Sequence, residues 1–134
     1  MKIIIVLTFK HLLDLWMKEK DSSIINLLET STHTNSLSHN LYTFGSNEMG
    51  QLGHKYDTSY FHSYNPNIVN ALSGKVIVSM SAGDGHSVCA TQDGYVYSWG
   101  ASACGQLGLD EDDKMPRDSE GYPFQPIPLQ IKQL

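Results

Sequence analysis

Histidines and acidic residues are the side chains of this 134-residue sequence that could bind a metal ion. The six histidines show neither an i, i+4 pair nor a His-Glu-x-x-His spacing, the patterns that place two imidazoles on one metal. The acidic run at residues 110–113 continues with Lys114 and Pro116 at the fifth and seventh loop positions, and it lacks the glycine that a calcium loop needs at the sixth. We therefore expect no metal site and interpret this run as a solvated loop.

Two cysteines and one serine are the candidate nucleophiles. Cys89 and Cys104 form no Cys-x-x-Cys motif, so the sequence indicates neither a zinc knuckle nor a disulfide framework. Ser87 follows His86 directly, and neighbours on a strand point to opposite faces, so adjacency alone does not make a catalytic pair. With no converging acid, base and nucleophile, we expect that the chain is not an enzyme and has no catalytic residue or cofactor.

Composition limits the class of protein. The chain is 40% hydrophobic, enough to bury a core, and its length suits one domain or a piece of one. A net charge of -5 argues against a basic surface for nucleic acids. No apolar stretch approaches a membrane span, and the apolar start at residues 3–9 precedes no small-residue cleavage site. We expect a soluble cytoplasmic or nuclear protein that is not secreted and binds no membrane.

An internal repeat organises the chain. At an offset of 55, residues 41–53 fall on residues 96–108 with six of thirteen positions identical, where chance gives about one. At an offset of 62, a Pro-x-x-apolar-x-x-Leu pattern at residues 66–72 recurs at residues 128–134. The chain is therefore expected to contain about two copies of one structural unit.

The first forty residues follow this repeat poorly. At an offset of 53, residues 24–33 match residues 77–86 only at their ends, so residues 22–40 are interpreted as a degenerate repeat remnant and residues 41–134 as the repeats proper. Residues 1–21 form a separate N-terminal segment. Within it residues 8–20 have apolar side chains at helical spacing, which predicts a short amphipathic helix that either caps an open sheet or binds a partner. Residues 3–7 are either a strand or the beginning of that helix.

Three antiparallel strands are predicted over residues 75–82, 86–91 and 95–99. Between the second and third strands, Asp93-Gly94 predicts a two-residue type I′ turn, in which both residues need a positive φ. The aromatic residues of the third strand share one face, because side chains alternate along a strand. That face is expected to pack against a neighbouring sheet.

Each repeat ends in Gly-Gln-Leu-Gly. Two glycines allow the chain to turn through positive φ, the leucine can fill apolar space beneath, and the glutamine amide can bond unpaired backbone groups of the turn. The motif at residues 50–53 lacks the Lys-Ser/Thr of a phosphate-binding loop, and no helical pattern follows it. We therefore interpret both copies as structural turns.

These motifs resemble the repeat of the regulator of chromosome condensation family. The family pattern is Ala-Gly-x-x-His-Ser, Asp-Gly-x-Val-Tyr-x-Trp-Gly and Gly-Gln-Leu-Gly, and residues 82–87, 93–100 and 105–108 match it in this order. The residues with a structural part in this motif are Gly45, Gly50, Gln51, Leu52, Gly53, Gly83, His86, Asp93, Gly94, Trp99, Gly100, Gly105, Gln106, Leu107 and Gly108.

The resemblance implies an all-β fold, a partial β-propeller of about two antiparallel blades that follow a short N-terminal helix. Because the family's ring has seven blades, the sequence suggests a fragment or truncated member that cannot close a ring alone. The implied function is a protein-interaction module, with self-association through open blade edges as a further expectation. The alternative is a guanine nucleotide exchange factor, or part of one, for a Ran-type small GTPase. For that alternative the resemblance makes Asp84 a partner-facing residue, while Asp84 as a turn acceptor is the simpler interpretation.

Overall fold

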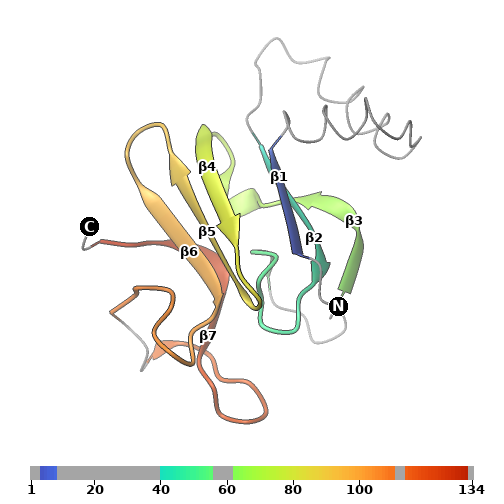
Figure 1. Ribbon diagram of the computed structural model, residues 1–134, viewed down its shortest axis with the longest axis vertical. Helices are drawn as coiled ribbons and strands as arrows, with labels where there is room; N and C mark the ends of the chain where they lie inside the picture. The colour runs from blue at the N-terminus through green and yellow to red at the C-terminus, as the bar shows by residue number, and fades with distance from the viewer. Residues whose placement is uncertain (1–3, 9–39, 56–61, 111–113, 133–134) are drawn as a thin grey trace.

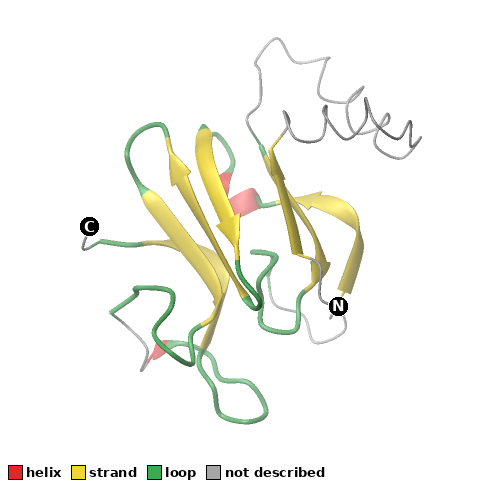
Figure 2. Ribbon diagram, in the orientation of Figure 1, coloured by secondary structure: helices red, strands yellow, loops and turns green. Residues whose placement is uncertain are grey.

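Two antiparallel sheets lie side by side in the computed structural model, which describes residues 4–8, 40–55, 62–110 and 114–132 (Figures 1 and 2). The first sheet has the strand order β1-β2-β3, with β1 at Ile4–Thr8, β2 at Leu41–Ser46 and β3 at His62–Ile68. The second has the order β4-β5-β6-β7, with β4 at Ile77–Ala82, β5 at His86–Thr91, β6 at Val96–Ala101 and β7 at Phe124–Gln130. The all-β prediction is confirmed, and so are the three antiparallel strands expected in the second unit.

The short 3-10 turn η1 at Asn70–Leu72 lies between the two sheets, and Lys114 also has 3-10 conformation. The amphipathic helix predicted for residues 8–20 lies outside the described residues except for Thr8, which ends β1. The repeat remnant predicted for residues 22–40 also lies outside them, apart from Asn40. No helix in the described part of the chain is long and apolar enough to span a membrane.

Both sheets use the same strand register at their outer hairpins. Tyr42 pairs with Ile68 as Tyr97 pairs with Gln130, and in each hairpin the pairing shifts before the glycine that is the second-last residue of the inner strand. These glycines, Gly45 and Gly100, have positive φ of 111° and 102°. A bulge of this kind adds local twist and re-aims the following side chains. The sequence repeat therefore corresponds to a repeated backbone geometry.

The N-terminal strand belongs to the first sheet of the repeat. β1 pairs with β2 so that Ile4 lies opposite Gly45, and β5 pairs with β6 so that His86 lies opposite Gly100. β1 thus holds the position of β5, and the open choice at residues 3–7 is settled as a strand over Ile4–Thr8. The sequence comparison assigned these residues to a separate N-terminal segment, and the structure shows that Ile4–Thr8 pairs with β2 in the first sheet. A comparison at fixed offset missed it, because residues 9–40 separate β1 from β2.

The turn between β5 and β6 differs from the predicted type I′ turn. Thr91 N–H donates to the Tyr95 carbonyl at 2.9 Å, and Gly94 N–H donates to the Thr91 carbonyl at 3.0 Å. The loop therefore has three residues, Gln92 to Gly94, with Gly94 at a φ of 88°. In such loops a turn is followed by one left-handed residue. The Thr91 hydroxyl also donates to the Asp93 carboxylate. Asp93 is therefore the middle residue of the three-residue loop, and Gly94 is the residue with left-handed backbone conformation.

The core lies between the two sheets. Trp99 is 0% exposed and Tyr97 is 8% exposed, so the aromatic face of β6 packs inward as predicted. Tyr95 shares that face in the sequence pattern, but it precedes β6 and is 45% exposed. The buried cluster joins residues of both units: Leu41, Val69, Leu72, Ile77, Cys89, Tyr97 and Trp99.

Candidate partner-binding loop face

The two Gly-Gln-Leu-Gly loops are built alike. In the first, Gly50 and Gly53 have φ of 71° and 76°, and the Gln51 side-chain oxygen accepts the Met49 N–H at 2.8 Å. In the second, Gly105 and Gly108 have φ of 69° and 63°, and the Gln106 side-chain oxygen accepts the Cys104 N–H at 2.8 Å. The glutamine amide thus holds each turn closed, as the sequence pattern suggested.

Leucine and a strand hydroxyl fix each loop to its own sheet. Leu52 and Leu107 are each 1% exposed. The Thr43 hydroxyl donates to the Leu52 carbonyl at 2.6 Å, and the Ser98 hydroxyl donates to the Leu107 carbonyl at 2.6 Å. Because these loops use their backbone groups within the fold, their geometry is that of a structural turn.

The first loop also joins the two units. The Gln51 carbonyl accepts the Trp99 indole N–H at 2.8 Å and the Ser87 hydroxyl at 2.9 Å. All three residues are buried, with at most 1% exposure. A Cβ on Gly53 would lie 2.9 Å from the Trp99 nitrogen, so this loop approaches the indole more closely than an alanine allows. Ser87 is therefore committed to this interface and does not form a catalytic pair with His86.

The turn between β4 and β5 carries Asp84. Gly83 N–H donates to the His86 carbonyl at 2.8 Å, and the His86 ring covers Gly83 so closely that a Cβ there would overlap it. Asp84 is exposed at the tip of this turn. The turn therefore holds one acidic side chain outward on a fixed frame.

This turn contacts loops of both units. Ala101 N–H donates to the Gly85 carbonyl at 2.8 Å, and a Cβ on Gly85 would lie 3.3 Å from Ala101 and 3.8 Å from Met49. Residues 47–53, 83–85 and 102–108 therefore lie at the same end of the two sheets, and Figure 1 shows the first two segments following the lower ends of β2 and β4. We name this surface the loop face. Its exposed residues include Asp84, Ala103 and Cys104.

Residues with chemical capacity are dispersed across the described part of the chain. Within it, no three His, Cys, Asp or Glu side chains lie close enough to hold a metal ion. Cys89 is buried, and burial raises the pKa of its thiol to about 12, while Cys104 is exposed. His54 Nε2 lies 2.9 Å from the Thr43 hydroxyl, and burial lowers the pKa of the imidazole below its usual value of 6.5. The buried Cys89 and the partly buried His54 therefore suit packing roles, and Cys104 is part of an exposed loop.

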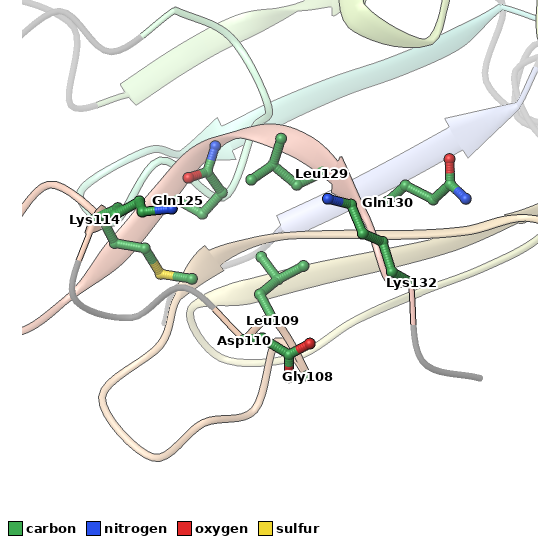
Figure 3. A pocket seen from close by; sticks show the side chains of 9 residues that line it. Gly108, Leu109, Asp110, Lys114, Gln125, Leu129, Gln130 and Lys132 are labelled. Atoms are coloured by element: carbon green, nitrogen blue, oxygen red, sulfur yellow. The ribbon is translucent and has the colours of Figure 1, made fainter.

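A hollow of about 410 Å³ lies between the loop that follows β6 and strand β7 (Figure 3). Leu109, Met115 and Leu129 supply its apolar lining, and Asp110 and Lys132 supply charges. A hollow of about 480 Å³ lies at the corresponding place of the first unit, with His54 in place of Leu109 and Asn67 in place of Leu129. The sequence motifs did not indicate this hollow, because the two copies differ at its lining residues.

Comparisons with known proteins match the repeated part of the chain. Family models of the regulator of chromosome condensation (RCC1) repeat match residues 38–90 and 93–134, and a second model of this repeat matches residues 77–106. The chain is 41% identical over 68 residues to the human E3 ubiquitin-protein ligase HERC2, which covers 51% of this chain and 1% of HERC2. It is 39% identical over 89 residues to human protein RCC2, which covers 65% of this chain and 16% of RCC2.

Solved structures agree with this assignment. Yeast RCC1 (Prp20), in its crystal structure with Kap60, matches with a TM-score of 0.62 at 27% identity, over 72% of this chain and 22% of that one. Prp20p of Saccharomyces cerevisiae, solved in a study of its binding to Gsp1p and histones, matches with a TM-score of 0.61 at 27% identity, over 72% of this chain and 23% of that one. This chain thus spans less than a quarter of the matched structures, and its two sheets resemble part of their propeller. Its sequence motifs, its repeated sheet geometry and the family models together show that the chain belongs to the RCC1 repeat family.

Proposed function

We propose that this protein is a protein-interaction module that recognises a partner through its loop face. The observation that carries this proposal is the turn at residues 83–85, where Asp84 projects from a frame fixed by the Gly83 to His86 and Ala101 to Gly85 hydrogen bonds. Such a surface loses little conformational entropy on binding, because its backbone is already ordered. Rigid scaffolds that present loops are a common way of building a recognition site.

A Ran-type small GTPase is the partner that we propose first. Prp20p, whose fold this chain shares in part, was studied for its binding to Gsp1p and histones. The exposed carboxylate of Asp84 suits a basic patch on a protein partner, while the net charge of -5 disfavours direct binding to nucleic acid. Cytoplasmic or nuclear residence is part of the same proposal.

The test is a binding titration with a fluorescently labelled Ran-type GTPase. We expect saturable binding that Asp84→Lys weakens at least about fivefold, since a reversed charge at a contact repels the partner's basic patch. Asp110→Lys is the matched control, because Asp110 is also exposed and lies beyond the second Gly-Gln-Leu-Gly loop. Absence of saturable binding, or equal effects of the two reversals, would contradict recognition through the turn.

The proposed activity is binding without turnover. The alternative is an exchange factor, in which contact with the GTPase accelerates release of its nucleotide. Binding alone is favoured because the repeated residues already have structural roles, such as Trp99 and Ser87 at the Gln51 carbonyl. Exchange would need a wider contact surface than the single exposed acid of the described loop face supplies.

Self-association through a sheet edge is a second proposal. β4 lies at the end of its sheet, it contains no proline, and Val78 on it is 60% exposed. The outer strand β7 contains Pro126 and Pro128, which lack the N–H that edge pairing needs. We expect Val78→Lys to lower any dimer fraction in sedimentation velocity. A dimer unaffected by this charge would exclude the β4 edge.

A further inference from the structure

The hollow of about 410 Å³ beside β7 has two fixed walls. One wall is the loop that follows β6, where the Ser98 hydroxyl donates to the Leu107 carbonyl at 2.6 Å. The other wall is β7, and just beyond its end the Ile131 N–H donates to the Val96 carbonyl at 2.9 Å. Because both walls are hydrogen-bonded to the sheet, binding a ligand here requires little ordering of the protein.

The inner lining of this hollow is aliphatic. Leu109, Met115 and Leu129 supply it, and Met115 is 7% exposed while Leu129 is 43% exposed. Figure 3 shows the side chains of Leu109 and Leu129 on opposite sides of the hollow, one from the loop and one from β7. A ligand with an aliphatic group would remove this leucine surface from water, and removal of apolar surface from water favours binding.

Positive charge lies at the edge of the aliphatic lining. In Figure 3 the Lys132 side chain turns back toward Leu129, so that its ammonium points into the hollow, and Lys114 lies on the other side. Asp110 supplies one negative charge, so the two lysines leave the lining positively charged. Within the described part of the chain Lys132 forms no ion pair. An anionic group of a ligand can therefore pair with this ammonium without displacing a partner.

The corresponding hollow of the first unit shows that this place is separate from the contact between units. It has a volume of about 480 Å³, and the described residues that line it all belong to the first unit. It therefore stays open although the second unit packs on that sheet. Its lining is polar, with His54, Asn67 and Asn70 where the second unit has two leucines and a lysine. The aliphatic lining with a lysine at its edge is thus particular to the second unit.

We propose that this hollow binds the C-terminus of a partner protein that ends in an aliphatic residue with a free carboxylate. The carboxylate pairs with the Lys132 ammonium, and the aliphatic side chain packs on Leu109, Met115 and Leu129. This site is distinct from the turn at residues 83–85, and its occupancy does not depend on the GTPase contact proposed for Asp84.

A C-terminal aliphatic residue fits this lining better than other anionic ligands do. It carries a carboxylate and an apolar side chain on one residue, which matches the ammonium of Lys132 pointing toward Leu129. A nucleotide base stacks on aromatic rings, and the described residues that line the hollow include none. A free amino acid would also place its own ammonium among the two lysines, whereas a peptide bond adds no charge.

The test compares two fluorescein-labelled peptides of sequence Gly-Ser-Gly-Ser-Leu, one with a free C-terminal carboxylate and one with a C-terminal amide. Fluorescence anisotropy should show saturable binding of the acid and at least about fivefold weaker binding of the amide, because the amide lacks the charge that pairs with Lys132. Lys132→Met keeps the apolar stem of the side chain but should bind both peptides equally. Lys55→Met is the matched control, since Lys55 is exposed and lines the hollow of the first unit, and it should keep the preference for the acid.

Leu129→Asn tests the aliphatic part of the site. It introduces the residue type that the first unit has at this position, Asn67, and Leu129 is exposed enough for the fold to tolerate the change. This variant should weaken the binding of the acid and of the amide alike, at least about fivefold, because both peptides lose the same apolar contact.

The native protein alone is enough to refute the proposal. No saturable binding of the acid, or equal binding of the acid and the amide, would overturn it. A preference for the acid that survives Lys132→Met, or that Lys55→Met removes, would place the carboxylate elsewhere and overturn it as well. Free leucine that displaces the labelled acid as well as the unlabelled peptide does would overturn the assignment to a protein C-terminus. Asp84→Lys should leave the binding of the acid unchanged, so this proposal and the GTPase proposal fail separately.

Discussion

Two donors share the buried Gln51 carbonyl, and removing them in turn tests how the two units are held together. Trp99→Phe removes the indole N–H and part of a side chain that is 0% exposed. The lost hydrogen bond costs about 1 kcal/mol and the void about 1–2 kcal/mol, so we expect about 2–3 kcal/mol of destabilisation. Ser87→Ala removes the second donor at a cost of about 1 kcal/mol.

The double variant should lose more than the sum of the two. After either single substitution the carbonyl keeps one donor, but after both it is buried with neither of them. An unpaired buried carbonyl costs about 1–3 kcal/mol, so the coupling energy between the two substitutions should be about 1 kcal/mol or more.

Urea unfolding of the four proteins, followed by circular dichroism, measures this coupling. Ser79→Ala is the matched control, since Ser79 is exposed on β4 and its hydroxyl should contribute less than about 0.5 kcal/mol. Additivity within about 0.3 kcal/mol would refute the shared-acceptor interpretation, because independent sites add to that precision.

Three further predictions concern the turns, one histidine and the first hairpin. Gly100→Ala should lower the free energy of unfolding by more than about 3 kcal/mol, because the added Cβ would overlap the Gly85 carbonyl. Gly94→Ala should lower it by only about 1 kcal/mol, because Gly94 has a φ of 88° but open space around it. Equal losses of stability in thermal melts of the two variants would contradict this. Burial lowers the pKa of His54, so its contribution to stability is complete above pH 6.5 and is lost as the pH falls through the lowered pKa of the folded state. His54→Gln should therefore flatten the melting temperature between about pH 5 and 7, and an unchanged slope would exclude this histidine. The third change replaces residues 10–39 by Gln-Asp-Gly, the loop that joins β5 to β6. The fold should persist, and the free energy of unfolding should rise by about 1–2 kcal/mol because the connection is shorter. Loss of the β-sheet signal in circular dichroism would show that β1 does not occupy the position equivalent to β5.

Local sequence patterns predicted much of the fold. Alternation and β-branched residues predicted β4, β5 and β6, and the spacing of the glycines predicted both Gly-Gln-Leu-Gly turns, because these features depend on residues close in the sequence. The turn at Asp93-Gly94 is a three-residue loop and not the predicted two-residue type I′ turn. The Thr91 hydroxyl bond to Asp93 favours the longer loop, and a pattern based on the Asp-Gly dipeptide alone does not include Thr91.

The sequence pattern did not predict the pairing of strands that are distant in the chain. β1 lies far from β2 in the chain, and its pairing depends on hydrogen bonds that no fixed offset reveals. The shared Gln51 carbonyl was also missed, because a backbone oxygen has no signature in side-chain motifs. For the candidate site, the pattern identified Asp84, while the contact of its turn with Met49 of the first unit needed the structure.

Stopped-flow release of labelled GDP from a Ran-type GTPase tests the central claim, binding without turnover, most directly. At concentrations that saturate binding, we predict a release rate within about twofold of the intrinsic rate for both the native protein and Asp84→Ala. An acceleration of about tenfold or more corresponds to a barrier lowered by roughly 1.4 kcal/mol. Such an acceleration by the native protein, lost in Asp84→Ala, would contradict the claim and establish the exchange-factor alternative.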